Sequence, residues 1–136
     1  MFLTALKTEQ KPHFLNLAQN MVSADGILKD DELAMMDQYK REMYVPMTEK
    51  EANCTAERSI ELFAAAPVTV QKQVVFELVA LAYADKEYAA EEEQLLRKII
   101  AGFGLDVDFL KDCLTYVEEL TAMYRRIEKL VDLISD

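Results

Sequence analysis

The sequence predicts an all-α fold, a compact helical bundle of two pseudo-repeated helix-loop-helix units followed by a long C-terminal helix. Apolar residues recur at helical spacing along most of the 136 residues, and no segment alternates with period two for long enough to form a strand. Only three Gly and three Pro interrupt the chain. A chain of this length has the size of one domain, so residues 1–136 are expected to form a single unit.

The first half of the repeat is expected over about residues 12–43. It opens at Pro12, which the first turn of a helix accepts. The apolar residues after it lie at steps 0, 1, 4, 7 and 8, on one helical face: Phe14, Leu15, Ala18, Met21 and Val22. The acidic stretch ADGILKDDE follows at 24–32, and a second helix is expected after it.

The second half, over about residues 72–103, repeats this pattern at an offset of 60. The same helical steps are occupied by Val74, Val75, Leu78, Leu81 and Ala82. The stretch ADKEYAAEE at 84–92 aligns with ADGILKDDE and sets Asp85 against Asp25 and Glu92 against Glu32. Each half is therefore predicted to be a helix, a short acidic junction and a second helix.

The segment between the halves is expected to contain a further helix. Pro46 disfavours helix before it, and Thr48–Glu51 has the form of a capping box, in which two side chains satisfy free backbone N–H groups. A break is expected near residues 53–55. The run AAAP at 64–67 ends this helix, and the second half of the repeat starts at Val68 or the residue after it.

The last predicted helix covers about residues 107–135. The sequence Gly102-Phe-Gly104 suits a left-handed cap on the preceding helix, and Asp106 or Asp108 caps the new one. A heptad pattern with spacing 3, 4, 3, 4, 3, 4, 3 follows: Leu110, Cys113, Val117, Leu120, Tyr124, Ile127, Val131 and Ile134. Two interpretations stay open, a helix packed along its own bundle and a seam that makes a two-fold dimer or binds a partner helix.

The charge balance argues against several functions. A net charge of −10 and a pI near 4.6 oppose contact with phosphate backbones, so nucleic acid is not an expected partner. No apolar run approaches the roughly eighteen residues of a membrane span, and the N-terminus lacks a signal sequence, so we expect a cytoplasmic protein without membrane insertion. The single histidine, His13, has no paired nucleophile or ligand near it in sequence, and a non-enzymatic protein is expected.

The two junctions carry a resemblance to a known family. Ala-Asp-Gly at 24–26, Leu28 two positions after the Gly, Glu32 seven after the Asp, and a weaker second copy resemble the TerB-like family of tellurite-resistance domains, over roughly residues 12–105. The resemblance implies a non-enzymatic bundle of pseudo-two-fold helix pairs, associated with stress responses and with divalent-cation binding. Where the family usually has Ser, three residues before the Glu, this chain has Lys29 and Ala89.

Four carboxylates are the candidate metal ligands: Asp25, Glu32, Asp85 and Glu92. A pseudo-two-fold arrangement would bring them together, where they must either hold protons or bind a hard cation such as Ca²⁺, Mg²⁺ or Mn²⁺. An EF-hand is excluded, because Ile27 and Lys29 occupy positions 3 and 5 of a loop that starts at Asp25.

The alternative for the junctions is structural. Both Asp side chains would accept backbone N–H bonds, both Glu side chains would stabilise helix starts, and Lys86 would supply positive charge in place of a metal. No cofactor is then required. The expected function is a binding or signalling module of the TerB-like kind, and the alternative is a structural domain that dimerises or docks a partner through its C-terminal helix.

Overall fold

The computed structural model describes residues 2–22, 30–43, 55–83 and 90–131, and for residues 30–33 it describes the helix without the side chains. These ranges are helical and contain no strand, which confirms the predicted all-α bundle. None of the helices they form has the length and apolarity to cross a membrane. The elements are η1 (Leu3–Ala5), α1 (Lys11–Val22), α2 (Asp30–Met43), α4 (Ala56–Ala64), α5 (Val68–Ala82), α6 (Ala90–Phe103) and α7 (Val107–Leu130).

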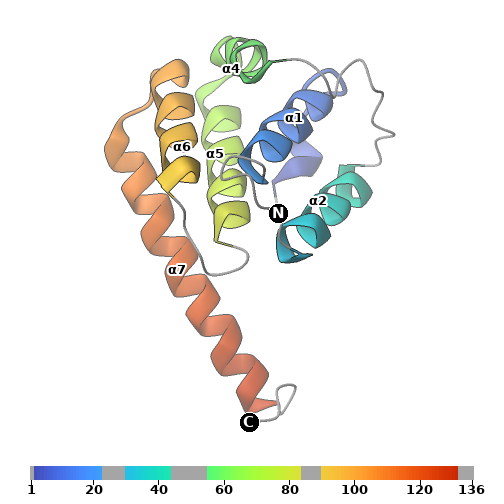
Figure 1. The fold of residues 1–136 in the computed structure, drawn as a ribbon, viewed down its shortest axis with the longest axis vertical. Coiled ribbons are helices and arrows are strands. Elements are labelled where there is room, and N and C mark those ends of the chain that lie inside the picture. The colour runs from blue at the N-terminus through green and yellow to red at the C-terminus, as the bar shows by residue number, and fades with distance from the viewer. Residues whose placement is uncertain (1, 23–29, 44–54, 84–89, 132–136) are drawn as a thin grey trace.

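The two equivalent helices of the repeat, α1 and α5, form the centre of the bundle. They pack against each other, and the apolar faces predicted for them are almost fully excluded from solvent. On α1, Phe14 and Leu15 are 0% exposed, as are their counterparts Val74 and Val75 on α5. Around this centre, α2 and α4 pack on α1, α6 packs on α4 and α5, and α7 packs on α5 and α6 (Figure 1).

Helix boundaries follow the predicted local signals. Thr55 caps α4 by accepting the backbone N–H of Arg58 at 3.2 Å, and α4 ends at Ala64 within the AAAP run. Gly104 has a φ of 72°, in the left-handed region that favours glycine. Asp106 caps α7 by accepting the N–H of Asp108 at 2.9 Å. The predicted capping box at 48–51 lies outside the described residues.

Two buried amide side chains hold the short helix α4 in place. At its start, Asn16 of α1 donates to the Thr55 carbonyl at 3.2 Å and to Ser59 Oγ at 2.8 Å. At its end, Gln71 of α5 donates to the carbonyls of Phe63 at 2.9 Å and Ala64 at 3.2 Å. The last carbonyls of a helix lack partners in its own i to i+4 ladder. The Phe63 carbonyl also accepts the backbone N–H of Ala66 at 3.0 Å, and Gln71 adds a side-chain donor to both carbonyls. These two side chains therefore join α4 to both central helices.

The N-terminal segment is tied to α5 through Glu77. The backbone N–H of Phe2 donates to Glu77 Oε1 at 2.8 Å, and the hydroxyl of Tyr39 on α2 donates to the Glu77 carbonyl at 3.2 Å. Burial and, after it, the charge of Glu77 raise the pKa of Tyr39 far above its ordinary value, so this hydroxyl stays protonated and remains a donor. The ring of Tyr39 also meets Phe14 edge to face at 5.2 Å. Glu77 thus joins η1, α2 and α5.

Close approach between α4 and α6 depends on Gly102. A Cβ at this position would overlap Cγ2 of Ile60, which is 7% exposed. At the surface of the same helix pair, Lys98 bonds Glu57, and this hydrogen bond is the main reason that the pKa of Glu57 lies below its usual range. Glycine at 102 therefore serves packing, whereas glycine at 104 serves the turn into α7.

Candidate functional site

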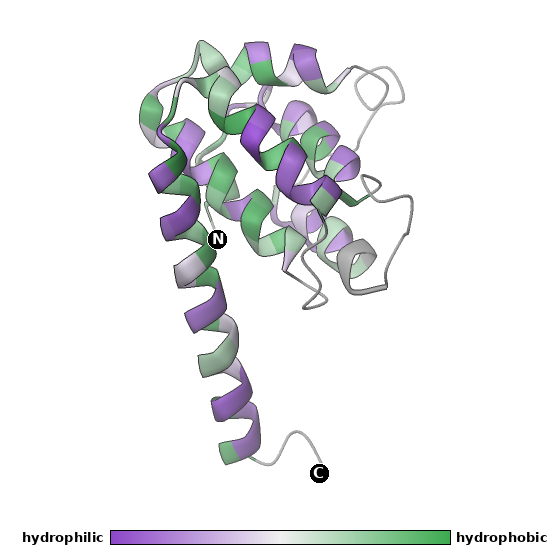
Figure 2. Cartoon of the chain, turned by 60° about the vertical axis from the view of Figure 1, so that its left-hand side comes forward, coloured by the Kyte–Doolittle hydropathy of each residue, from purple (hydrophilic) through white to green (hydrophobic). Residues whose placement is uncertain are grey.

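The helix α7 has a buried part and a projecting part. Leu110, Cys113 and Val117 are 1%, 3% and 3% exposed where α7 packs on the bundle, and burial raises the pKa of the Cys113 thiol to about 11. Beyond Val117 the helix continues past the bundle, as Figures 1 and 2 show. There, Leu120 and Tyr124 of the predicted heptad seam are 39% and 59% exposed. The predicted seam is therefore buried on the bundle in the first part of α7 and exposed in the second.

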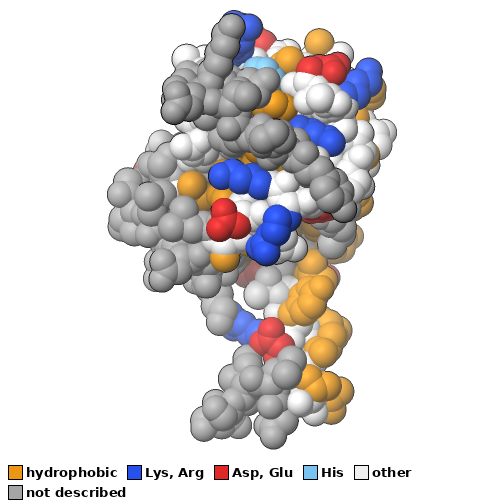
Figure 3. Space-filling view, turned by 90° about the vertical axis from the view of Figure 1, so that its right-hand side faces the viewer, with side chains coloured by type: hydrophobic (Ala, Val, Ile, Leu, Met, Phe, Trp, Pro, Cys, Tyr) orange, Lys and Arg blue, Asp and Glu red, His pale blue; other side chains and the backbone are white. Residues whose placement is uncertain are grey.

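Exposed apolar residues form one continuous line on α7, which we call the α7 stripe. Its members, spaced 4, 3, 4 and 3, are Tyr116, Leu120, Met123, Ile127 and Leu130, and they are 61%, 39%, 50%, 47% and 83% exposed. This spacing places them on one helical face. Figure 3 shows hydrophobic side chains along the projecting part of the molecule. A contiguous apolar surface of this kind is typical of a protein interaction site.

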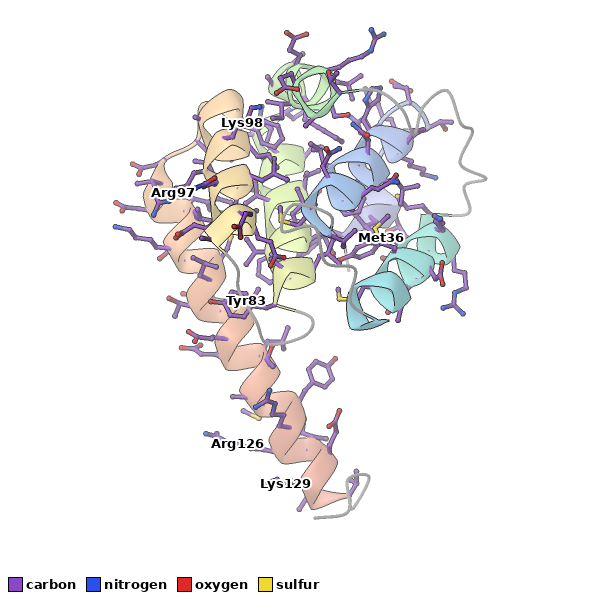
Figure 4. The ribbon with its side chains drawn as sticks, in the orientation of Figure 1. Met36, Tyr83, Arg97, Lys98, Arg126 and Lys129 are labelled. Atoms are coloured by element: carbon purple, nitrogen blue, oxygen red, sulfur yellow. The ribbon has the colours of Figure 1, made fainter. Side chains whose placement is uncertain are left out.

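Acidic and basic residues are separated along the projecting part of α7. Glu118 and Glu119 come at the start of the projecting part, and Arg125 and Arg126 come seven residues later. All four side chains are exposed. Figure 4 shows Arg126 together with Lys129 on the projecting part, away from the bundle. The helix is therefore acidic near the bundle and basic toward its end.

A hollow of about 280 Å³ lies on another face of α7, beside the end of α5. Tyr83 contributes one wall, and burial, followed by the charges of Glu118 and Glu93, raises its pKa. A second hollow, of about 270 Å³, has the aromatic rings of Phe2, Phe76 and Phe109 in its lining. Neither hollow brings together a set of groups suited to acid–base or nucleophilic chemistry within the described ranges.

The four candidate metal ligands are described unequally. Asp25 and Asp85 lie outside the described residues. Glu32 and Glu92 are the third residues of α2 and α6, the helical positions expected for them, but only the side chain of Glu92 is described. That side chain is 1% exposed, and no group of three or more metal-ligating side chains occurs within the described ranges.

His13 and Ser59 form a contact that the sequence did not predict. His13 Nδ1 lies 2.9 Å from Ser59 Oγ, which also accepts the hydrogen bond from Asn16. Ser59 is 0% exposed, so its hydroxyl is closed to a substrate. The contact between the two side chains is part of the packing between α1 and α4. No sequence signal pairs these residues, because they lie 46 positions apart.

Comparison of the chain with protein-family models, with curated proteins and with solved structures finds no match in any of the three. The resemblance to the TerB-like family is therefore carried by the residues of the two junctions and by nothing outside them. Among the described residues, the α7 stripe is the most extensive exposed apolar feature.

Proposed function

We propose that this protein is a non-enzymatic interaction module that binds a helix along the α7 stripe. The observation that carries the proposal is the line of five exposed apolar side chains of the α7 stripe, four of which follow Val117 on the part of α7 that projects past the bundle. The 4-3-4-3 spacing is that of a helix-binding seam, in which each apolar side chain inserts between side chains of the facing helix.

The energetics of α7 favour the same conclusion. With 24 residues α7 is about 36 Å long, and tertiary packing normally supplies most of the stability of a helix in water. The projecting part has little such packing, since residues 122–127 are all exposed. Covering the stripe with a second helix would contribute about 25 cal/mol for each Å² of apolar surface removed from water.

Site-specific photo-cross-linking in cells tests the proposal. A photoreactive residue introduced at Met123, within the stripe, is expected to form a protein adduct, because a bound helix would lie within reach of that side chain. The same residue at Lys111, an exposed position on another face of α7, is the matched control and is expected to form none. Equal labelling at both positions, or no adduct at Met123, would contradict the proposal.

Divalent-cation binding at the two junctions is a second candidate function, favoured by the burial of Glu92. A carboxylate that is 1% exposed is costly unless a proton, a positive charge or a cation compensates it. If Glu92 belongs to a set of four carboxylates, a hard cation would bind only the folded chain and stabilise it. This function is compatible with binding along α7, since α6 and α7 are separate helices.

Thermal unfolding after EDTA treatment tests cation binding. A cation at a hundred times its dissociation constant would stabilise the fold by about 2.7 kcal/mol, which raises the melting temperature by several degrees. Addition of Ca²⁺, Mg²⁺ or Mn²⁺ is expected to produce this rise in the wild-type protein and not in Asp25→Asn/Asp85→Asn. Asp108→Asn, on the surface of α7, is the control and should respond as wild type does. If no cation changes the melting temperature, the junctions have only the structural role.

A further inference from the structure

We infer that the helix bound by the α7 stripe is α7 of a second copy of this chain, in an antiparallel two-fold pair. The inference rests on the proposed function, because it names the occupant of the same surface. Two features of α7 favour a second copy, the symmetry of the apolar spacing and the order of the flanking charges. The position of the bundle favours the antiparallel orientation.

The apolar spacing reads the same in both directions. From Tyr116 through Leu120 and Met123 to Ile127 the steps are 4, 3 and 4. If Leu120 faces the partner's Met123 in an antiparallel pair, Tyr116 faces the partner's Ile127. The two-fold axis repeats both contacts, which gives four layers of paired side chains along the interface. Each of the four exposed apolar side chains of one copy therefore contacts an apolar side chain of the other.

The charges fit the same register. Glu119 and Arg126 precede Leu120 and Ile127 by one position, so both flank the seam on the same side. Positions that flank a seam form the salt bridges between paired helices and set their orientation. In the antiparallel register Glu119 lies beside the partner's Arg126, and the symmetry repeats the pair. A parallel pair would instead bring these two charges beside Tyr124 and Val131, which carry none.

The position of the bundle favours the same orientation. The bundle covers the first half of α7, as the burial of Leu110, Cys113 and Val117 shows. An antiparallel pair puts the two bundles at opposite ends of the paired helices, whereas a parallel pair crowds them at one end (Figure 1). The overlap from Tyr116 to Ile127 is twelve residues, or about 18 Å. A short overlap of this kind is expected to give a weak, reversible dimer.

Sedimentation equilibrium of the full chain tests the dimer and its orientation. The mass is expected to rise with concentration from 15.6 kDa toward about 31 kDa. Glu119→Arg and Arg126→Glu each place like charges together at both ends of the seam, and each should weaken self-association by at least about tenfold. In a dimer that contains one copy of each variant, positions 119 and 126 of the two chains again carry opposite charges. An equimolar mixture is therefore expected to form this mixed dimer with wild-type affinity.

Circular dichroism checks that each variant stays folded, and Arg97→Glu on the surface of α6 is the matched charge change that should leave the dimer intact. If the single variants dimerise as wild type does, or if their mixture stays monomeric, the antiparallel pair is wrong. If the wild-type chain is monomeric throughout while Met123 cross-links to a different protein, the second copy is overturned and the proposed function survives. Monomer without any adduct at Met123 overturns both.

Discussion

Replacing Phe63 by Ala is expected to lower the free energy of unfolding by about 3–5 kcal/mol, the range typical for a fully buried Phe. Phe63 is 0% exposed and stands near the end of α4, where its ring meets Phe103 of α6 with centroids 6.1 Å apart. The substitution removes the transfer free energy of the ring and leaves a cavity between α4 and α6, which the surrounding helices fill only in part.

Urea unfolding followed by circular dichroism measures this loss. Phe63→Leu keeps most of the volume and should retain the larger part of the stability. Val68→Ala provides the control, because Val68 is 56% exposed and its truncation should change the stability by less than about 0.5 kcal/mol. A loss below about 1 kcal/mol for Phe63→Ala would mean that α4 does not pack on α6 as described.

Gln71→Leu is expected to lower the free energy of unfolding by about 1 kcal/mol, because it removes the side-chain amide that bonds the carbonyls of Phe63 and Ala64, while Phe63 keeps the backbone N–H of Ala66. Leucine has a similar size, so the loss would come from the two hydrogen bonds of the amide and not from a change in packing. Gln94→Leu, at an exposed position of α6, is the control and should be nearly neutral. Equal effects of the two substitutions would show that Gln71 does not cap α4.

Gln71→Glu is expected to be more destabilising than Gln71→Leu near neutral pH. The introduced carboxylate would face two carbonyl oxygens at the negative end of the α4 dipole, so its pKa in the folded chain would rise above the unfolded value of about 4.3. Below that unfolded pKa both states hold the proton and the charge penalty is absent. As the pH rises, the unfolded state ionises first and stability is lost, so the difference from wild type should grow between acid and neutral pH.

The acidic junctions show what local sequence could and could not predict about these residues. Their spacing placed Glu32 and Glu92 at helix starts, and the two residues stand third in α2 and α6. The burial of Glu92 was not predictable, because it depends on which other helices cover the start of α6. For the same reason nothing in the local sequence singled out Asn16, Ser59 or Gln71. These polar residues matter through partners from other helices, and polar side chains have no periodic signature of their own.

The C-terminal helix shows the same division within one element. Its heptad spacing predicted a long helix with an apolar face, but the face turned out to be two surfaces, one buried on the bundle through Leu110, Cys113 and Val117 and one exposed beyond it. Where the bundle ends along α7 depends on the lengths and positions of α5 and α6, to which α7 packs. The exposed α7 stripe is therefore rotated from the predicted seam and shares with it Leu120 and Ile127.

Local sequence was sufficient for the all-α class, several helix boundaries and the apolar faces of α1 and α5, because helical periodicity, caps and glycine conformation depend on residues a few positions apart. Contacts between helices were required to assign the amide links to α4, the burial of Glu92 and the division of α7. Each of these depends on side chains distant in sequence, whose approach is set by the packing of the whole bundle.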